Sequence, residues 1–306
     1  MKLRNTAAAA AVVLALAATA TACGKSGSPD DNGDKSSDGA SAPSGLTYKV
    51  NTSADVKDSS VFAKVKGKTI TIGTKADQPG LGYENPGTKK RVGFDIEIAR
   101  MIAADLGFDE GHIKFVTVPT EARETQIASG GVDLYVGTYT INDERKKQVG
   151  FAGPYYIAGQ DLLVKADSSI KGPDDLKGKK VCSATGSTPL KRIKEEKYGV
   201  AEAKAQQVYQ LCVQDLVNGS VDAVTTDDSI LKGYAAENKG ALKVVGNTFS
   251  KEPYGVGLKK DDTALREAVN KALEAHVKNG DWKKAYDATL GKSGAAAPNP
   301  PAVDRY

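Results

Sequence analysis

The spacing of apolar residues along the chain changes between a period of two residues, which is typical of strands, and a helical period. Residues 69–74 alternate like a strand, and residues 93–107 place apolar side chains on one helical face. Residues 113–118 then predict a second strand, residues 121–129 a short helix, and residues 132–136 a third strand. This order of strand, helix, strand, helix and strand predicts a parallel sheet in an α/β fold.

A second set of the same kind follows the extended segment at residues 160–165. We expect further strands or extended segments at 180–184, 206–209, 221–227, 242–245 and 254–258, and further helices at 190–197, 210–218, 264–278 and 281–288. The globular part is long for a single hydrophobic core and therefore predicts two lobes.

The first 22 residues have the composition of an export signal. Lys2 and Arg4 precede an alanine-rich apolar stretch that is too short to span a membrane comfortably. Small residues then precede Cys23, which resembles the lipobox of bacterial lipoproteins, where that cysteine carries lipid; the alternative is a secretory signal with an incidental cysteine. We expect residues 1–22 to be removed, Cys23 to anchor the chain outside the cell membrane, and residues 23–59 to form a disordered tether.

Charge and composition argue against several classes of function. Removing Lys2 and Arg4 with the signal lowers the formal charge from +4 to +2, which does not favour nucleic acid. The chain has two distant histidines and no HExxH, paired CxxC, GxGxxG or P-loop pattern, so we expect no metal site and no cofactor. Cys182 and Cys212 would most simply pair in an exported protein, and two free buried thiols are the alternative.

Residues 137–147 carry the candidate chemistry. The preceding strand ends at a glycine, after which Thr138 and Thr140 offer hydroxyls beside free N–H groups. Arg145 offers a planar set of donors suited to a carboxylate. Ligands of open α/β sheets bind at the carboxyl ends of strands, so this stretch is consistent with a carboxylate clamp. The alternative is an ordinary strand-to-helix turn with Arg145 exposed to solvent.

Three segments resemble the hallmarks of family 3 extracellular solute-binding proteins, the amino-acid receptors of ABC importers. They are residues 93–103, residues 140–156 and residues 221–227. The loop at residues 77–80 and the two later cysteines resemble most the glutamate-binding lipoproteins of actinobacteria. The resemblance implies a type II periplasmic-binding-protein fold, in which two α/β lobes with parallel sheets are joined by two hinge crossings.

The resemblance covers residues 65–290 and implies how the chain divides between the lobes. Lobe 1 is expected to combine residues 60–156 with residues 256–291, and lobe 2 to be the insertion of residues 157–255. Residues 292–306 are rich in alanine and proline, and we expect them to be disordered.

The resemblance also implies ligand-binding roles. Arg145 is expected to bind the α-carboxylate of an amino acid and Asp227 its α-ammonium group. Lys75 and Arg123 would favour a second carboxylate, unless one of them points to solvent or pairs between the lobes, for instance with Glu121. The full set of expected ligand-binding residues is Lys75, Arg123, Gly137, Thr138, Thr140, Arg145, Thr185, Gly186, Ser187 and Asp227.

The implied function is that of a substrate-binding component of an ABC importer. As a monomer it would capture glutamate or aspartate, close, and present the ligand to a membrane permease and its ATPase without doing chemistry. The alternatives are a receptor for glutamine or asparagine, a sensor subunit for a membrane receptor, and a same-fold enzyme such as a prephenate-type dehydratase. An enzyme requires a general acid or base in the cleft. Histidine and cysteine are absent from the motif loops, and a carboxylate base stays open.

Overall fold

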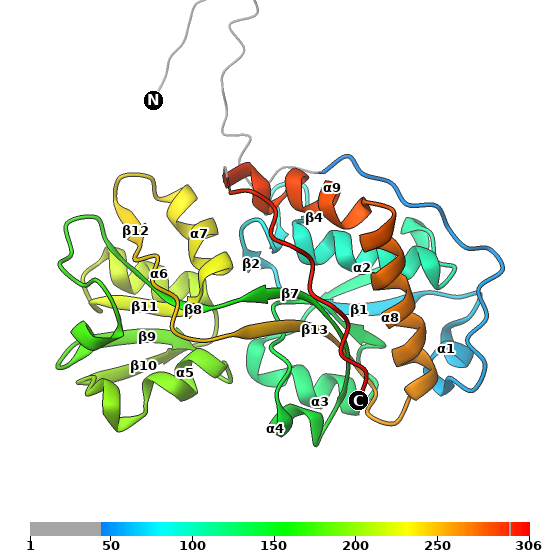
Figure 1. Cartoon of the computed structure of the whole chain (residues 1–306), viewed down its shortest axis with the longest axis horizontal. Coiled ribbons are helices and arrows are strands. Elements are labelled where there is room, and N and C mark those ends of the chain that lie inside the picture. The colour runs from blue at the N-terminus through cyan, green and yellow to red at the C-terminus, as the bar shows by residue number, and fades with distance from the viewer. Residues whose placement is uncertain (1–43, 294) are drawn as a thin grey trace, which may run out of the picture. The chain divides into compact units, whose positions relative to one another are not determined.

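The computed structural model describes residues 44–293 and 295–306. The expected signal peptide, Cys23 and the tether as far as residue 43 lie outside the described residues. Two five-stranded sheets organise the described chain (Figure 1), and each is covered by helices, with α2 and α3 beside the first and α7 and α5 beside the second. We call the part built on the first sheet lobe 1 and the part built on the second sheet lobe 2.

The sheet of lobe 1 has the order β5-β1-β6-β13-β7. Its strands are β1 (Ile70–Thr74), β5 (Ile113–Thr117), β6 (Leu134–Tyr135), β7 (Gly150–Ala158) and β13 (Glu252–Leu258). The first three are parallel, as the sequence predicts, whereas β13 runs antiparallel to both β6 and β7. The sheet is therefore mixed. Its last two strands, β7 and β13, are also the segments that connect the lobes.

The helices of lobe 1 bury apolar faces that the sequence pattern predicts. They are α1 (Ser60–Val65), α2 (Phe94–Asp105), α3 (Arg123–Ala128), α4 (Asp143–Lys146), α8 (Thr263–Lys278) and α9 (Asp281–Ala288). In α2, Phe94, Ile98 and Met101 are fully buried. Trp282 of α9 packs edge-on against Phe94 with ring centroids 5.3 Å apart, and it ties the last helix to the body of the lobe.

The sheet of lobe 2 has the order β10-β9-β11-β8-β12. Its strands are β8 (Gln160–Lys165), β9 (Lys180–Ala184), β10 (Glu202–Gln206), β11 (Ala223–Asp227) and β12 (Leu242–Val244), and its helices are α5 (Thr188–Ile193), α6 (Tyr209–Val217) and α7 (Asp228–Glu237). Two features differ from the sequence prediction. The strand expected at 206–209 lies earlier, and α7 was not predicted because it follows β11 without a turn and contains a helix-weakening glycine.

The lobes are joined by two connections that lie side by side (Figure 1). Strands β7 and β13 pair along their length, from Gly150 with Leu258 to Ala158 with Glu252, and they leave lobe 1 together. The loop after β1 forms a three-stranded sheet of β2 (Asp77–Gln78), β3 (Gly82–Glu84) and β4 (Arg91–Val92), where the sequence predicts only turns. Short 3-10 helices complete the fold at Glu110–His112, Thr120–Ala122, Pro173–Leu176, Glu196–Tyr198 and Leu290–Ser293.

Two segments that we expected to be disordered make specific contacts with lobe 1. In residues 44–59, Ser44 and Tyr48 donate hydrogen bonds to the buried carboxylate of Glu97. In residues 295–306, the tyrosine hydroxyl at the last position accepts a hydrogen bond from the backbone N–H of Phe151 at 2.8 Å. Apolar side chains of both segments pack on the core, and their burial stabilises the ordered arrangement. The composition of the segments alone does not reveal these contacts.

Cys182 and Cys212 form a disulfide, with their Cα atoms 5.4 Å apart. The pairing expected from the sequence is therefore confirmed, and it joins β9 to α6. Within residues 44–293 and 295–306, none of the helices has the length and apolar character needed to cross a membrane.

Candidate functional site

A small polar cavity lies where loops from the two lobes meet. Its volume is about 10 Å³, which corresponds to the space of a single water molecule. Side chains from the ends of strands and the starts of helices line it: Thr120, Arg123, Thr138, Thr140, Arg145, Ser187, Thr188, Pro189, Tyr209, Asp227 and Ile230. Six of these residues belong to the set expected from the sequence.

Arg145 is held at the cavity by the short helix α4. The side chain of Asn142 caps this helix by accepting a hydrogen bond from the Arg145 N–H. The guanidinium donates to the carbonyl of Thr140 at 2.7 Å and to the carboxylate of Glu124 at 3.1 Å. Burial, together with the nearby charge of Arg123, lowers the pKa of Arg145 to about 10, so the group stays positively charged at neutral pH.

Arg123 approaches the same point from α3. It is 3% exposed and donates from Nε to the backbone carbonyl of Thr120 at 2.8 Å. The guanidinium groups of Arg123 and Arg145 lie 4.4 and 4.9 Å from the ring centroid of Tyr139. The electron-rich face of this ring partly compensates two like charges that are held close together.

Both arginines donate to one carbonyl oxygen of lobe 2. The Gly186 oxygen accepts from Arg123 at 3.3 Å and from Arg145 at 3.2 Å. Gly186 has φ +76°, and a Cβ at this position would lie 2.7 Å from the Cα of Glu121 in lobe 1. Only glycine permits this approach, so the loop after β9 reaches the arginines through a residue without a side chain.

Thr185 and Ser187, the neighbours of Gly186, use their side chains in hydrogen bonds within lobe 2. Thr185 donates its hydroxyl hydrogen to the carbonyl of Gln206 and does not line the cavity. Ser187 lines the cavity and caps α5 by accepting a hydrogen bond from the Leu190 N–H at 3.1 Å. The start of α5, with the partial positive charge of a helix N-terminus, therefore lies at the cavity.

Lys75 does not line the cavity itself but contacts Thr120, which does. Its ammonium group is 2% exposed and donates to the hydroxyl of Thr120 at 2.9 Å, and this threonine lines the cavity. Burial lowers the pKa of Lys75 to about 8, against the opposing effect of Asp77. The alternatives of a solvent-exposed Lys75 or Arg123 do not hold in this structure, although Arg123 does contact the other lobe.

Asp227 faces the cations from the end of β11 in lobe 2. One carboxylate oxygen accepts a hydrogen bond from the Tyr254 hydroxyl at 2.7 Å. The other oxygen is buried and has no hydrogen-bond partner among the residues that the structure describes. Burial and the nearby charge of Glu252 raise the pKa of Asp227 to about 7. A cationic donor placed beside this oxygen would relieve the cost of burying the charge.

Thr138 has the left-handed backbone conformation, with φ +45°. Its N–H donates to the buried carboxylate of Asp95 at 3.1 Å, and its hydroxyl donates to the Gln78 side-chain oxygen at 3.2 Å. The amide nitrogen of Gln78 is buried without a partner within the described part of the chain. Gly137 does not line the cavity, and a Cβ on it would meet the Tyr135 hydroxyl at 2.8 Å.

The sequence did not single out Thr120, Thr188, Pro189, Tyr209 or Ile230 as cavity residues. Thr120 is the first residue of a 3-10 helix after β5, and Tyr209 is the first residue of α6. Their places at the carboxyl ends of strands are a signal that could have identified these two residues.

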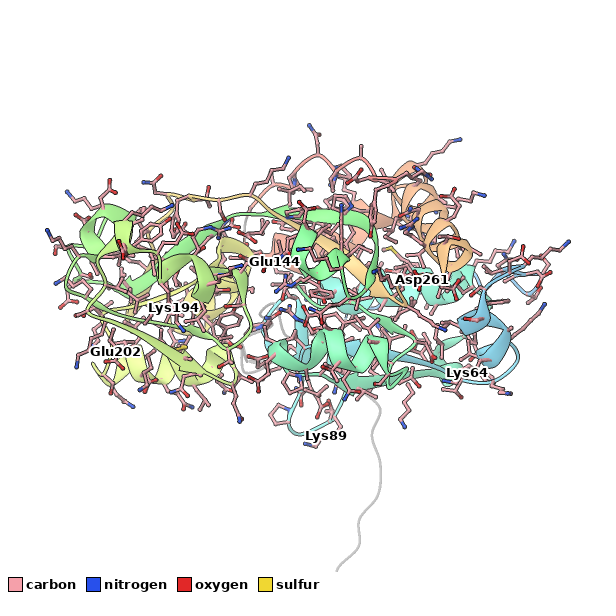
Figure 2. All side chains as sticks on the ribbon, turned by 90° about the horizontal axis from the view of Figure 1, so that it is seen from below. Lys64, Lys89, Glu144, Lys194, Glu202 and Asp261 are labelled. Atoms are coloured by element: carbon pink, nitrogen blue, oxygen red, sulfur yellow. A yellow bond between two sulfur atoms is a disulfide. The ribbon has the colours of Figure 1, made fainter. Side chains whose placement is uncertain are left out.

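Charged side chains also meet at the outer border between the lobes. The ammonium group of Lys191 in α5 lies 2.6 Å from the Glu144 carboxylate in α4. In Figure 2, Glu144 lies where α4 faces lobe 2, whereas Lys194 and Glu202 lie on lobe 2 away from that border. Both partners of the pair are 69% exposed, so this ion pair contributes little to holding the lobes together.

Comparison with known proteins identifies relatives along most of the chain. Residues 70–292 match the family model described as bacterial extracellular solute-binding proteins, family 3. The chain is 40% identical to the glutamate-binding protein GluB of Corynebacterium efficiens, over 76% of this chain and 82% of that protein. It is 37% identical to the glutamine-binding protein GlnH of Bacillus subtilis, over 87% of this chain and 89% of that protein.

Solved structures give the same picture of the fold. An ancestral arginine-binding protein bound to arginine superimposes with a TM-score of 0.68 and 39% sequence identity, over 73% of this chain and 98% of that chain. These relatives are named for binding amino acids, and the named ligands differ in charge. The ligand of this chain must therefore be argued from its own cavity.

Proposed function

We propose that this chain, which belongs to the family 3 bacterial extracellular solute-binding proteins, captures glutamate or aspartate between its lobes and delivers it to the permease and ATPase of an ABC importer. Relatives named for glutamate and glutamine binding support an amino-acid ligand. The charges around the cavity support an acidic one.

An excess of buried cations at one cavity is the observation that carries the acidic ligand. Among the residues that line the cavity, two are cations, Arg123 and Arg145, and one is a carboxylate, Asp227, which leaves a formal charge of +1. Glutamate and aspartate each bring −1 and neutralise the site. Glutamine and asparagine would leave +1, and arginine would raise it to +2. Because unpaired buried charge is costly, the site favours the acidic ligands.

The α-amino-acid end of the ligand would lie between Arg145 and Asp227. Arg145 would bind the α-carboxylate with the donor that now reaches the Gly186 oxygen, helped by the hydroxyl and N–H groups around Thr138 and Thr140. The free carboxylate oxygen of Asp227 would accept from the α-ammonium group. In the complex, Thr185, Gly186 and Ser187 would close over the ligand from lobe 2.

The side-chain carboxylate would lie on the side of Arg123 and Thr120. Arg123 would donate to it directly. Because the Thr120 hydroxyl accepts from Lys75, its own hydrogen is available for an acceptor in the cavity. Lys75 would thus act on the ligand through Thr120.

The chain would work on the outer face of the cell membrane, anchored by lipid on Cys23. The family is extracellular, which supports this location. Mass spectrometry of the membrane-bound protein would find a diacylglyceryl and acyl group on Cys23. A Cys23→Ser variant would be released into the medium, and a variant that stays on the membrane would contradict the anchor.

Calorimetric titration of residues 24–306, the chain without its expected signal and without Cys23, tests the acidic ligand. The protein is first unfolded and refolded to remove ligand carried over from the cells, and glutamate, aspartate, glutamine, asparagine and arginine are then titrated separately. We expect glutamate or aspartate to bind at least about tenfold more tightly than the amides, which corresponds to a difference of about 1.4 kcal/mol in binding free energy. An amide or arginine that binds more tightly would overturn the acidic ligand.

An enzyme on the same fold is the second candidate, because the raised pKa of Asp227 suits a general acid. NMR spectra of prephenate and of the five amino acids, incubated with the purified protein, would detect turnover. Spectra that remain unchanged while glutamate binds would favour the receptor. A product that forms at a catalytic rate would favour the enzyme.

A further inference from the structure

The lobes also meet at a second place, where β2 of lobe 1 contacts α6 and α7 of lobe 2 (Figure 1). Asp77 in β2 and Gly233 and Tyr234 in α7 make the contact, against Tyr209 of α6, the Asp77 backbone and Pro79. Asp77, Gly233 and Tyr234 do not line the cavity.

Asp77 caps a helix that belongs to the other lobe. Helix α6 begins at Tyr209 after Val208, whose side chain has no hydrogen-bond acceptor. The Asp77 carboxylate accepts a hydrogen bond from the Tyr209 N–H at 3.2 Å. It thereby satisfies one of the free N–H groups at the positive end of the helix. Because the two partners lie in different lobes, this bond exists only when the lobes are closed.

The first turn of α6 is held in place by the disulfide. Cys212 lies three residues after Tyr209, and its bond to Cys182 joins the helix to the central part of the lobe 2 sheet. A hydrogen bond at the start of α6 is therefore made to a fixed part of lobe 2.

Helix α7 completes the contact through two neighbouring residues. The Tyr234 hydroxyl donates to the backbone carbonyl of Asp77. A Cβ on Gly233 would lie 2.3 Å from the carbonyl oxygen of Pro79, so a side chain there would push the lobes apart. Gly233 lies inside α7, where alanine would be the better helix former. The glycine thus weakens its own helix and permits the close approach.

We propose that Asp77, Gly233 and Tyr234 form a closure latch, a set of positioning residues that stabilises the closed protein without contacting the ligand. The inference rests on the proposed function. When a ligand binds only the closed form, its apparent dissociation constant is the intrinsic constant divided by the fraction of ligand-free protein that is closed. Loss of the latch should therefore raise the dissociation constants of all ligands by the same factor.

Substitutions of Asp77 separate its hydrogen bond from its charge. Asp77→Ala removes the acceptor and the charge, whereas Asp77→Asn removes the charge and keeps an acceptor that caps helices well. In the same protein, residues 24–306, we expect Asp77→Ala to raise the dissociation constants of glutamate and aspartate about fivefold and Asp77→Asn to have a smaller effect. Tyr234→Phe should raise both constants about threefold.

Gly233→Ala gives the most distinctive result. We expect the dissociation constants of glutamate and aspartate to rise about tenfold, from the clash with Pro79, while the thermal midpoint of the ligand-free protein stays the same or rises. Ala236→Gly is the matched control, because it lies exposed in the same helix. That variant should lower the thermal midpoint and leave the dissociation constants unchanged.

Small-angle X-ray scattering of the ligand-free proteins measures lobe separation directly. We expect a larger radius of gyration for Gly233→Ala and Asp77→Ala than for the wild type. Wild-type affinities and an unchanged radius in both variants would overturn the latch, as would a change in the ratio of glutamate to aspartate affinity. A wild type that binds none of the amino acids would defeat the proposed function, and the latch would then be judged from the radius alone.

Discussion

Two arginines from different helices share one ring and one carbonyl in this protein. Arg123 and Arg145 stack near Tyr139 and donate to the Gly186 oxygen. A neutral carbonyl leaves the charges of two buried cations uncompensated, whereas a carboxylate pairs with them and can accept from a guanidinium in bidentate fashion. An anionic ligand can therefore displace the loop oxygen and gain free energy.

The side-chain end of the ligand can be tested at Arg123. We expect Arg123→Gln to raise the dissociation constant of glutamate about 30-fold, because a charged hydrogen bond contributes roughly 1.5–3 kcal/mol. The constant for glutamine should rise less than about threefold. Calorimetric titration of both ligands measures the ratio. Lys75→Met should shift the ratio in the same direction, and equal losses for the two ligands would contradict the assignment of both cations.

The pKa shifts at the cavity predict that glutamate affinity depends on pH. Below about pH 7 the free protein binds a proton at Asp227, so affinity falls as the partner of the ammonium group is lost. Above about pH 8 Lys75 loses its proton and affinity falls again. Affinity is thus highest between these values and changes by up to tenfold per pH unit outside them.

Titrations between pH 5 and 9 measure this profile. Lys75→Met is the control, because it should abolish the fall above pH 8 and keep the fall below pH 7. A flat profile in the wild type would contradict the roles of both residues.

At the scale of elements, the cavity is built from short segments whose ends are fixed elsewhere. Helix α4 has four residues and α5 has six, and both begin at a residue whose side chain caps them; the cap of α5, Ser187, lines the cavity, and α4 presents Arg145 to it. Helices this short are not stable alone, so they depend on the sheets behind them. In lobe 2 the disulfide adds to this support by joining β9, whose exit loop carries Gly186, to α6.

Reduction of the disulfide should destabilise lobe 2. The bonded cysteines are 30 residues apart. By the chain-entropy model such a bond contributes about 3.6 kcal/mol to the free energy of unfolding. Urea unfolding with and without a phosphine reductant measures the difference. The Cys182→Ser/Cys212→Ser variant should have the free energy of unfolding of the reduced protein, and the reductant should not change it. Equal stability in both conditions would contradict a stabilising bond.

At the scale of the whole described molecule, the two lobes are closed upon each other more tightly than an amino acid allows. The cavity has room for about one water molecule. The contacts that close it are the Gly186 oxygen at the arginines and the latch at Asp77. The Gly186 contact lies at the cavity, whereas the latch lies at β2, so a ligand that displaces the Gly186 oxygen can leave the latch in place. Full opening about the paired strands β7 and β13 would break both contacts.

A crystal structure of the glutamate complex should therefore differ from this one in a defined way. We expect both hydrogen bonds from the arginines to the Gly186 oxygen to be broken, and the ligand carboxylates to occupy their donors. The sheets of the individual lobes should superimpose unchanged on this structure. A complex that keeps both bonds to Gly186 would contradict the proposed binding mode.

The elements, the division into two lobes and most charged residues of the cavity follow from the sequence. Helical and strand periods are local properties, so α2, β1 and the capped start of α4 could be predicted from neighbouring residues. The hallmark segments add the family and its fold. The segments at either end of the described chain were predicted less well, because their order depends on contacts with lobe 1.

The sequence by itself determined which side chains carry charge and which elements present them. Only the tertiary structure decided which of them meet. Arg123 and Gly186 are 63 positions apart, and Asp77 and Tyr209 are 132 apart. No local period relates such positions, because their contact depends on the packing of two sheets and on glycines that let backbones approach. Lys75 therefore proved to lie behind Thr120, and Asp77 to cap a helix in the other lobe.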